Sequence, residues 1–211
     1  MSLPERDTLL AEVRSLTEAY KAGGPPAADA FRELTHLLLR LTVLAPEGGV
    51  RLFSGPRGRP EFVLGGWRGH HDPLPLTDGR YLRLTVRLYV APVEELSRLK
   101  VASSSYQYQL DREGDRWVFR YDYLRNPPDP HPSAHVQVRA NLVEDCLPRD
   151  VTLQRIHFPT ARVSLEAVIR LLADQFGTPC HKPPEVWRPV LAETERTFLE
   201  IAHRPLGGPE R

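Results

Sequence analysis

Hydrophobic and polar residues alternate with a period of two through the middle of the chain and follow a helical period at both ends. The longest alternation covers residues 80–90 and predicts a strand with one buried and one solvated face. Residues 106–123 alternate on both sides of a turn that holds Asp111, Gly114 and Asp115, and this pattern predicts a β-hairpin. The aromatic side of the hairpin should lie in the core.

Helical spacing predicts two helices near each end of the chain. The first should end at the Gly-Gly-Pro-Pro run of residues 23–26. The second covers residues 27–44 and carries a wide apolar stripe that must pack on a sheet or on a second subunit. Near the C-terminus, Ser164 is the predicted N-cap of a helix that Gly177 ends, and a last helix follows at residues 185–203.

Further strands are predicted at residues 50–53, 61–64 and 134–140, and the short connections favour an antiparallel sheet. The sequence therefore predicts an α+β fold, with a central antiparallel sheet of about five or six strands flanked by an N-terminal helix pair and C-terminal helices. The expected regions are residues 1–46, a helical region packed on the core, residues 47–178, the sheet core with a helix, and residues 179–211, a C-terminal helix and tail.

Composition limits the class of protein but does not specify its task. The 211 residues are 41% hydrophobic and carry a formal net charge of +1, so the chain can bury a substantial core and its overall field neither requires nor excludes a polyanionic partner. Cys146 and Cys180 lie far apart in the sequence, which favours reduced thiols. Without a recognisable signal peptide or membrane-spanning run, we expect a cytoplasmic protein that does not enter a membrane.

The polar positions of the predicted strands would share one surface of the sheet. That surface holds four arginines and one histidine against a single carboxylate. Guanidinium groups bind phosphate with a planar fork of donors, so RNA is the natural ligand. A solvated polar face without a ligand is the alternative. The residues of this surface are Arg83, Thr85, Arg87, Gln107, Gln109, Arg120, Asp122, His135, Gln137 and Arg139.

Three segments resemble a family of bacterial toxins. They are the run YQYQLDREGDRWVFRYD that begins at Tyr106, the loop HPSAHV that begins at His131, and the helix SLEAVI that begins at Ser164. Together they are similar, over residues 104–175, to the TumE toxins of toxin–antitoxin systems. The resemblance implies a toxin that acts on RNA and has a cognate antitoxin as its partner.

Cleavage of RNA on this face would need neither a metal ion nor a cofactor. His135 would act as general acid or base, Asp122 would orient it, and Arg120 with Arg139 or Arg87 would hold the phosphate. Alternatively, His135 is a strand residue bonded to Asp122 for structural reasons. The other RNA-binding candidates are Arg83, Gln107, Gln109 and Gln137.

A second hypothesis needs no RNA. The protein would then be a non-catalytic interaction module or a subunit of a bacterial complex, and its apolar helices would join a partner protein or form a homodimer. Salt separates the two hypotheses, because phosphate contacts weaken steeply as salt rises whereas an apolar helix interface persists.

Overall fold

The computed structural model describes residues 3–24, 26–55, 61–93, 96–128, 133–139 and 161–202. In these residues the chain forms four helices and one seven-stranded antiparallel sheet, which confirms the predicted α+β class. The helices are α1 (Leu3–Ala22), α2 (Pro26–Leu41), α3 (Leu165–Asp174) and α4 (Pro184–Ala202). The strands are β1 (Val50–Ser54), β2 (Glu61–Gly66), β3 (Leu74–Pro75), β4 (Tyr81–Val93), β5 (Leu96–Gln109), β6 (Trp117–Leu124) and β7 (Ala134–Val138).

The strands follow the order β1-β2-β4-β5-β6-β7, with β3 beside β4. Six of the strands were predicted, and the seventh is β3, whose two residues are too short to show an alternation. Strand β5 starts well before residue 106, where the predicted hairpin arm begins, and it pairs with β4 along the whole of β4. The pattern does not reveal this extension because Ser103 and Val101 pair with the consecutive residues Arg87 and Leu88, so that Ala102 is an extra residue that interrupts the alternation of β5.

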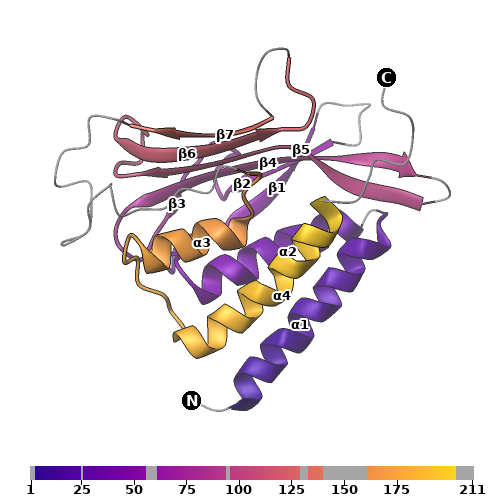
Figure 1. The fold of residues 1–211 in the computed structure, drawn as a ribbon, viewed down its shortest axis with the longest axis horizontal. Helices are drawn as coiled ribbons and strands as arrows, with labels where there is room; N and C mark the ends of the chain where they lie inside the picture. Colours follow the sequence, from indigo (N-terminus) through magenta and orange to yellow (C-terminus); the bar gives the residue numbers. More distant parts are fainter. Residues whose placement is uncertain are drawn as a thin grey trace.

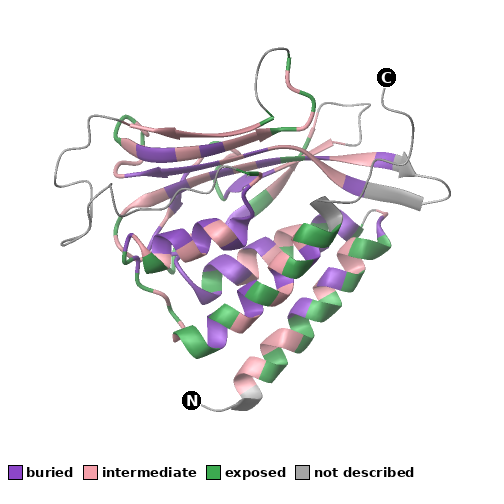
Figure 2. Ribbon diagram, viewed as in Figure 1, coloured by how far each residue is buried: buried purple, intermediate pink, exposed green. Residues whose placement is uncertain are grey.

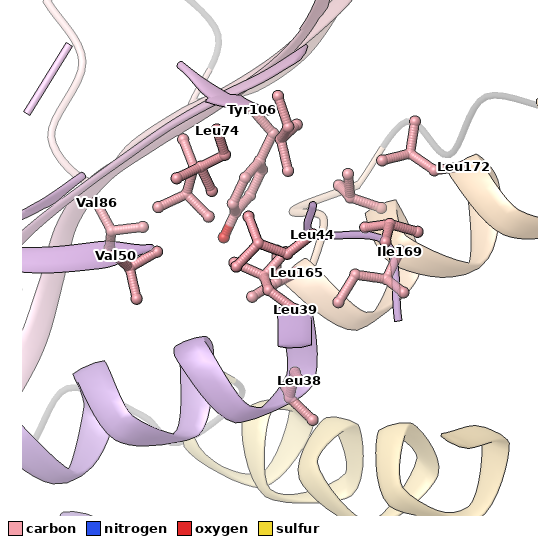
Figure 3. Close-up of a cluster of buried hydrophobic side chains, with 14 of the residues drawn as sticks. Leu38, Leu39, Leu44, Val50, Leu74, Val86, Tyr106, Leu165, Ile169 and Leu172 are labelled. Carbon is pink, nitrogen blue, oxygen red and sulfur yellow. The ribbon is translucent and has the colours of Figure 1, made fainter. Parts of the chain in front are cut away.

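All four helices lie on one side of the sheet, and the hydrophobic core fills the space between the two layers (Figures 1 and 2). Side chains from the sheet and from α2 and α3 meet there, among them Tyr106, Leu39 and Ile169 (Figure 3). The rings of Tyr108 and Phe119 are fully buried, with centroids 5.6 Å apart. The predicted aromatic core side of the hairpin is confirmed for Tyr106, Tyr108, Phe119 and Tyr121.

The predicted start of α3 and the predicted ends of α1 and α3 are confirmed, whereas α2 ends at Leu41 rather than at residue 44, and Leu44 instead forms a bridge with Leu76. The Ser164 hydroxyl accepts a hydrogen bond from the Ala167 amide at 3.0 Å, which caps α3. Gly177 follows α3 with φ of 68°, and Gly23 follows α1 with φ of 78°.

The apolar stripe of α2 is buried against other elements of the same chain. Leu38, Leu39 and Leu41 are buried, and α2 packs against α1, α3, α4 and β1. One core cluster takes in residues of all three expected regions, such as Leu39, Leu84 and Val190. No helix in the described part of the chain is long and apolar enough to cross a membrane.

Candidate functional site

The outer face of the sheet is the surface turned away from the helices. Residues directly opposite each other on neighbouring antiparallel strands point to the same face. The register places Asp122 opposite Ser105 of β5 and His135 of β7, and it places Arg120 opposite Gln137. The three predicted catalytic residues therefore come together on the outer face, on two adjacent strands.

Hydrogen bonds join these side chains into one cluster. Arg120 donates from Nε to Asp122 Oδ2 and from Nη2 to Gln137 Oε1, each at 2.7 Å. Ser105 donates from Oγ to Asp122 Oδ1, also at 2.7 Å. His135 Nε2 lies 3.6 Å from Asp122 Oδ2. Asp122 is thus the shared acceptor at the centre of the cluster.

The order of these groups differs from that of a hydrolase triad. In such a triad the imidazole lies between the hydroxyl and the carboxylate, so that it can take the hydroxyl proton. Here the Asp122 carboxylate lies between Ser105 and His135. Ser105 therefore bonds to a carboxylate and not to the imidazole, and the carboxylate serves to position its neighbours.

One ring nitrogen of His135 is buried and the other faces its neighbours on the sheet. Its Nδ1 is buried, and its Nε2 faces Asp122 and lies 3.4 Å from the amide nitrogen of Gln137. A general acid or base must come within hydrogen-bond reach of the proton that it transfers. The imidazole would have to rotate to do so, and the observed arrangement therefore suits binding better than proton transfer.

Two predicted RNA-binding residues lie on the outer face but are buried. Gln107 is 5% exposed and Gln109 is 0% exposed. Gln107 donates to Gln109 Oε1 at 2.8 Å, and Gln109 donates to the carbonyls of Asp111 at 2.7 Å and Arg112 at 3.2 Å. The expectation that these amides are open to a ligand is corrected, because both amides bond to the protein itself.

The turn between β5 and β6 folds back over this part of the face. Gly114 has φ of 87°, and a Cβ there would lie 2.8 Å from a guanidinium nitrogen of Arg83. Arg83 donates to the Glu113 carbonyl at 3.0 Å, and Arg139 donates to the Asp115 carbonyl. Both arginines were predicted to bind phosphate, and in the structure each holds the turn in place.

The loop of residues 67–72 also crosses the outer face. A Cβ at Gly65 would lie 2.5 Å from the His70 Cα, so the loop backbone rests directly on β2. Thr85 donates to the His70 carbonyl at 3.0 Å. An ion pair between Arg112 and Asp72 ties this loop to the β5–β6 turn. The covered part of the outer face, defined by Arg83, Gln107 and Gln109, is thus closed by two linked segments.

The rest of the outer face is accessible and positively charged. Arg87 is exposed, and among the described residues no carboxylate lies within ion-pair distance of it. Partial burial and the nearby charges of His70, Arg83 and Arg87 lower the pKa of His71. We call this region the open part of the outer face; it consists of Arg87, Ser105, Arg120, Asp122, His135 and Gln137.

Two residues of this face were not predicted. Ser105 lies two positions before Gln107, so the same alternation would have placed it beside Asp122. Arg51 points outward because its neighbour Leu52 packs on the core, and its guanidinium carbon lies 5.6 Å from the centroid of the Phe53 ring. Strand parity alone could have identified both.

Among the described residues, no group of three His, Cys, Asp or Glu side chains is arranged to hold a metal ion. The chain matches no family model, no curated protein and no solved structure in the comparisons. The resemblance of residues 104–175 to the TumE toxins therefore stays a prediction, and the site must be interpreted from its own geometry.

Proposed function

We propose that the protein binds RNA through phosphate contacts on the open part of the outer face. The proposal rests on the charge of Arg87. This side chain is exposed, and no carboxylate of the described residues forms an ion pair with it. Arg120 is the second contact. Its Nε and Nη2 are held by Asp122 and Gln137, which fixes the plane of the guanidinium and leaves Nη1 as the donor for a phosphate oxygen.

The covered part of the face is excluded from the contact surface. Hydrogen bonds from Gln107, Gln109, Arg83 and Arg139 go to other groups of the protein. The remaining surface presents Arg87 and Arg120, and His71 lies near Arg87. Such a surface suits a single RNA strand, whose backbone supplies the negative charge.

Fluorescence anisotropy with a labelled RNA decanucleotide tests the proposal. Arg87→Ala and Arg120→Ala should each weaken binding and reduce the dependence of log K on log salt by about 0.7, the contribution of one phosphate on a single strand. Arg196→Ala is the matched control, because Arg196 is an exposed arginine of α4 in the helical layer. Equal behaviour of all three variants would refute the proposal.

RNA cleavage is a finer hypothesis on the same residues. It requires His135 to turn a ring nitrogen toward the 2′-hydroxyl, and we expect binding without cleavage. Incubation of the RNA with the protein in EDTA measures this directly. Fragments that the intact protein produces and His135→Ala does not would add a catalytic step, and induced expression of the two proteins in bacteria would then show whether it arrests growth.

The helix-mediated interaction module has weaker support. Among the described residues, three large hydrophobic side chains are exposed, and they lie on separate elements. They are Trp67 at 63%, Leu124 at 38% and Leu199 at 47% exposed. Scattered single residues of this kind do not form an apolar interface.

A further inference from the structure

Trp67 is the most exposed large hydrophobic side chain of the described residues, at 63%. Trp187, by contrast, is 2% exposed and belongs to the core. A large indole contributes strongly to binding when a partner covers it. Trp67 therefore lies outside the core, where a ligand can reach its ring.

The loop that carries Trp67 is held in a fixed shape. The Asp72 amide donates to the Gly69 carbonyl at 2.9 Å, and the Arg68 amide donates to Asp72 Oδ2 at 3.2 Å. The Asp72 carboxylate is also paired with Arg112. These contacts fix the start of the loop, so the indole is pre-positioned before any ligand arrives.

The indole ring lies against the backbone of a glycine. A Cβ at Gly49 would be 3.2 Å from Trp67 Cε3 and 3.8 Å from Cδ2, so the ring packs where a side chain would otherwise stand. Gly49 is buried beneath it. The ring is therefore supported on one side by the backbone, while most of its surface faces solvent.

Two arginines lie in the neighbourhood of Trp67. Arg40 donates to the Pro46 carbonyl at 3.0 Å, which places its guanidinium beside the turn that contains Gly49. Arg68 is the exposed neighbour of Trp67 in the sequence. Burial, then the charge of Arg40, lowers the pKa of His36, which lies near the same glycine, so the positive charge comes from the arginines.

We propose that Trp67 stacks on an unpaired base of the bound RNA while Arg40 and Arg68 contact the adjoining phosphate. An exposed ring with nearby cations binds any base, because every base offers a flat π face, whereas the bases of a duplex are stacked and paired. This inference rests on the proposed function and assigns its ligand class as single-stranded RNA. Three acidic residues of the described part of the chain lie in this neighbourhood: Glu47 is exposed, Glu33 is paired with Arg32, and Asp72 is paired with Arg112.

Trp67 packs on Gly49 next to the edge strand β1 and near His36 of α2. One RNA strand that contacts Arg87 and Trp67 therefore passes over this edge of the sheet. Val63 is opposite Arg87, and Trp67 follows Val63 by four positions along β2 and the next turn. At about 3.3 Å per residue this is a separation of roughly 13 Å. A decanucleotide is long enough to cover it.

Binding of a labelled single-stranded decanucleotide and of the same strand annealed to its complement tests the inference. Trp67→Ala should weaken single-strand binding by about 5- to 150-fold, the range for loss of one stacked base. Trp67→Phe should restore most of the affinity, and duplex binding should be weaker and unaffected. Leu199→Ala, which removes an exposed hydrophobic side chain from α4, is the control.

Each outcome separates the inference from the proposed function. If Trp67→Ala binds like the intact protein while Arg87→Ala is weakened, stacking is refuted and the phosphate site stands. If Trp67→Ala is weakened and Arg87→Ala is normal, stacking stands without the predicted phosphate site. Equal losses in Trp67→Ala and Leu199→Ala refute stacking, and no binding of either RNA by the intact protein refutes both.

Discussion

The two faces of the central sheet are both partly closed to solvent, but by opposite kinds of chemistry. The helix side is closed by apolar packing, with Tyr108 and Phe119 fully buried beneath the helices. The covered part of the outer face is closed by hydrogen bonds, with Gln109 just as inaccessible. A polar side chain in a strand is therefore not always exposed to solvent.

The difference shows how polar residues come to be buried at an acceptable cost. A buried amide is tolerated when its donors and acceptor are bonded. The amide groups of Gln107 and Gln109 bond to each other and to two turn carbonyls, and the turn itself is fastened by Arg83. The open part lacks such a cover, and that leaves its charged groups available to a ligand.

Removing a core ring should have the largest effect. Phe119→Ala deletes a buried ring that contacts Tyr108, Tyr121 and Phe176, and it should lower the free energy of unfolding by about 3–5 kcal/mol. Leu124→Ala, on the exposed side of the same strand, should change it by less than about 0.5 kcal/mol. Urea unfolding of both variants measures the contrast, and similar losses would show that the two faces are not energetically distinct.

A substitution in the covered part of the outer face should lower the free energy of unfolding by less than Phe119→Ala does. Gln109→Ala leaves the carbonyls of Asp111 and Arg112 without their donor in a buried site, which should cost about 1–3 kcal/mol. RNA affinity at a temperature where the variant is folded should be unchanged, because Gln109 is inaccessible. A loss of affinity with unchanged stability would mean that the turn opens and exposes this glutamine to the ligand.

The face of the sheet that each of these residues occupies was predictable from the sequence. Alternation placed Tyr106 and Tyr108 on one side and Arg120 and Asp122 on the other, because side-chain direction in a strand follows position parity. It also placed His135 on the outer face, and pairing of β6 with β7 completes that cluster. The local alternation was thus enough to place Arg120, Asp122 and His135 on the same face.

The covers were not predictable in the same way. Gly65 and Gly114 allow close approach of the loop and the turn, but only the folded backbone shows what approaches them. Likewise, the pairing of Arg112 with Asp72 joins residues far apart in the sequence. Accessibility depends on such long-range contacts, whereas alternation reports only which face a residue occupies.

The helix side also holds a buried carboxyl group, that of Glu166 in α3. Burial raises the pKa of Glu166 above its ordinary value, although hydrogen bonds with Thr194 and Ser164 oppose the shift. The folded protein therefore retains a proton that the unfolded chain releases above its own pKa near 4.5. The stability that this proton provides is present at low pH and is lost as pH rises toward the folded pKa.

Glu166→Gln should remove this dependence. Relative to the intact protein, the variant should gain stability progressively as the pH rises above about 4.5, because glutamine does not ionise. Thermal unfolding between pH 4 and pH 8 measures the difference. Glu185→Gln, at an exposed position in the first turn of α4, should follow the intact protein throughout. A constant difference at all pH values would show that Glu166 does not titrate in this range.

Asp122→Asn should have only a small effect on stability, because its ion pair with Arg120 is partly solvated. The side chains are 23% and 37% exposed, and such pairs contribute at most about 1 kcal/mol. The substitution removes the one carboxylate of the open part and frees charge on Arg120, so RNA should bind somewhat more tightly and with a steeper salt dependence. Anisotropy titrations at two salt concentrations, with chemical unfolding as the parallel measurement, decide the matter. Weaker RNA binding by a stably folded Asp122→Asn would mean that the orientation which Asp122 imposes on Arg120 and His135 matters more than the negative charge it adds.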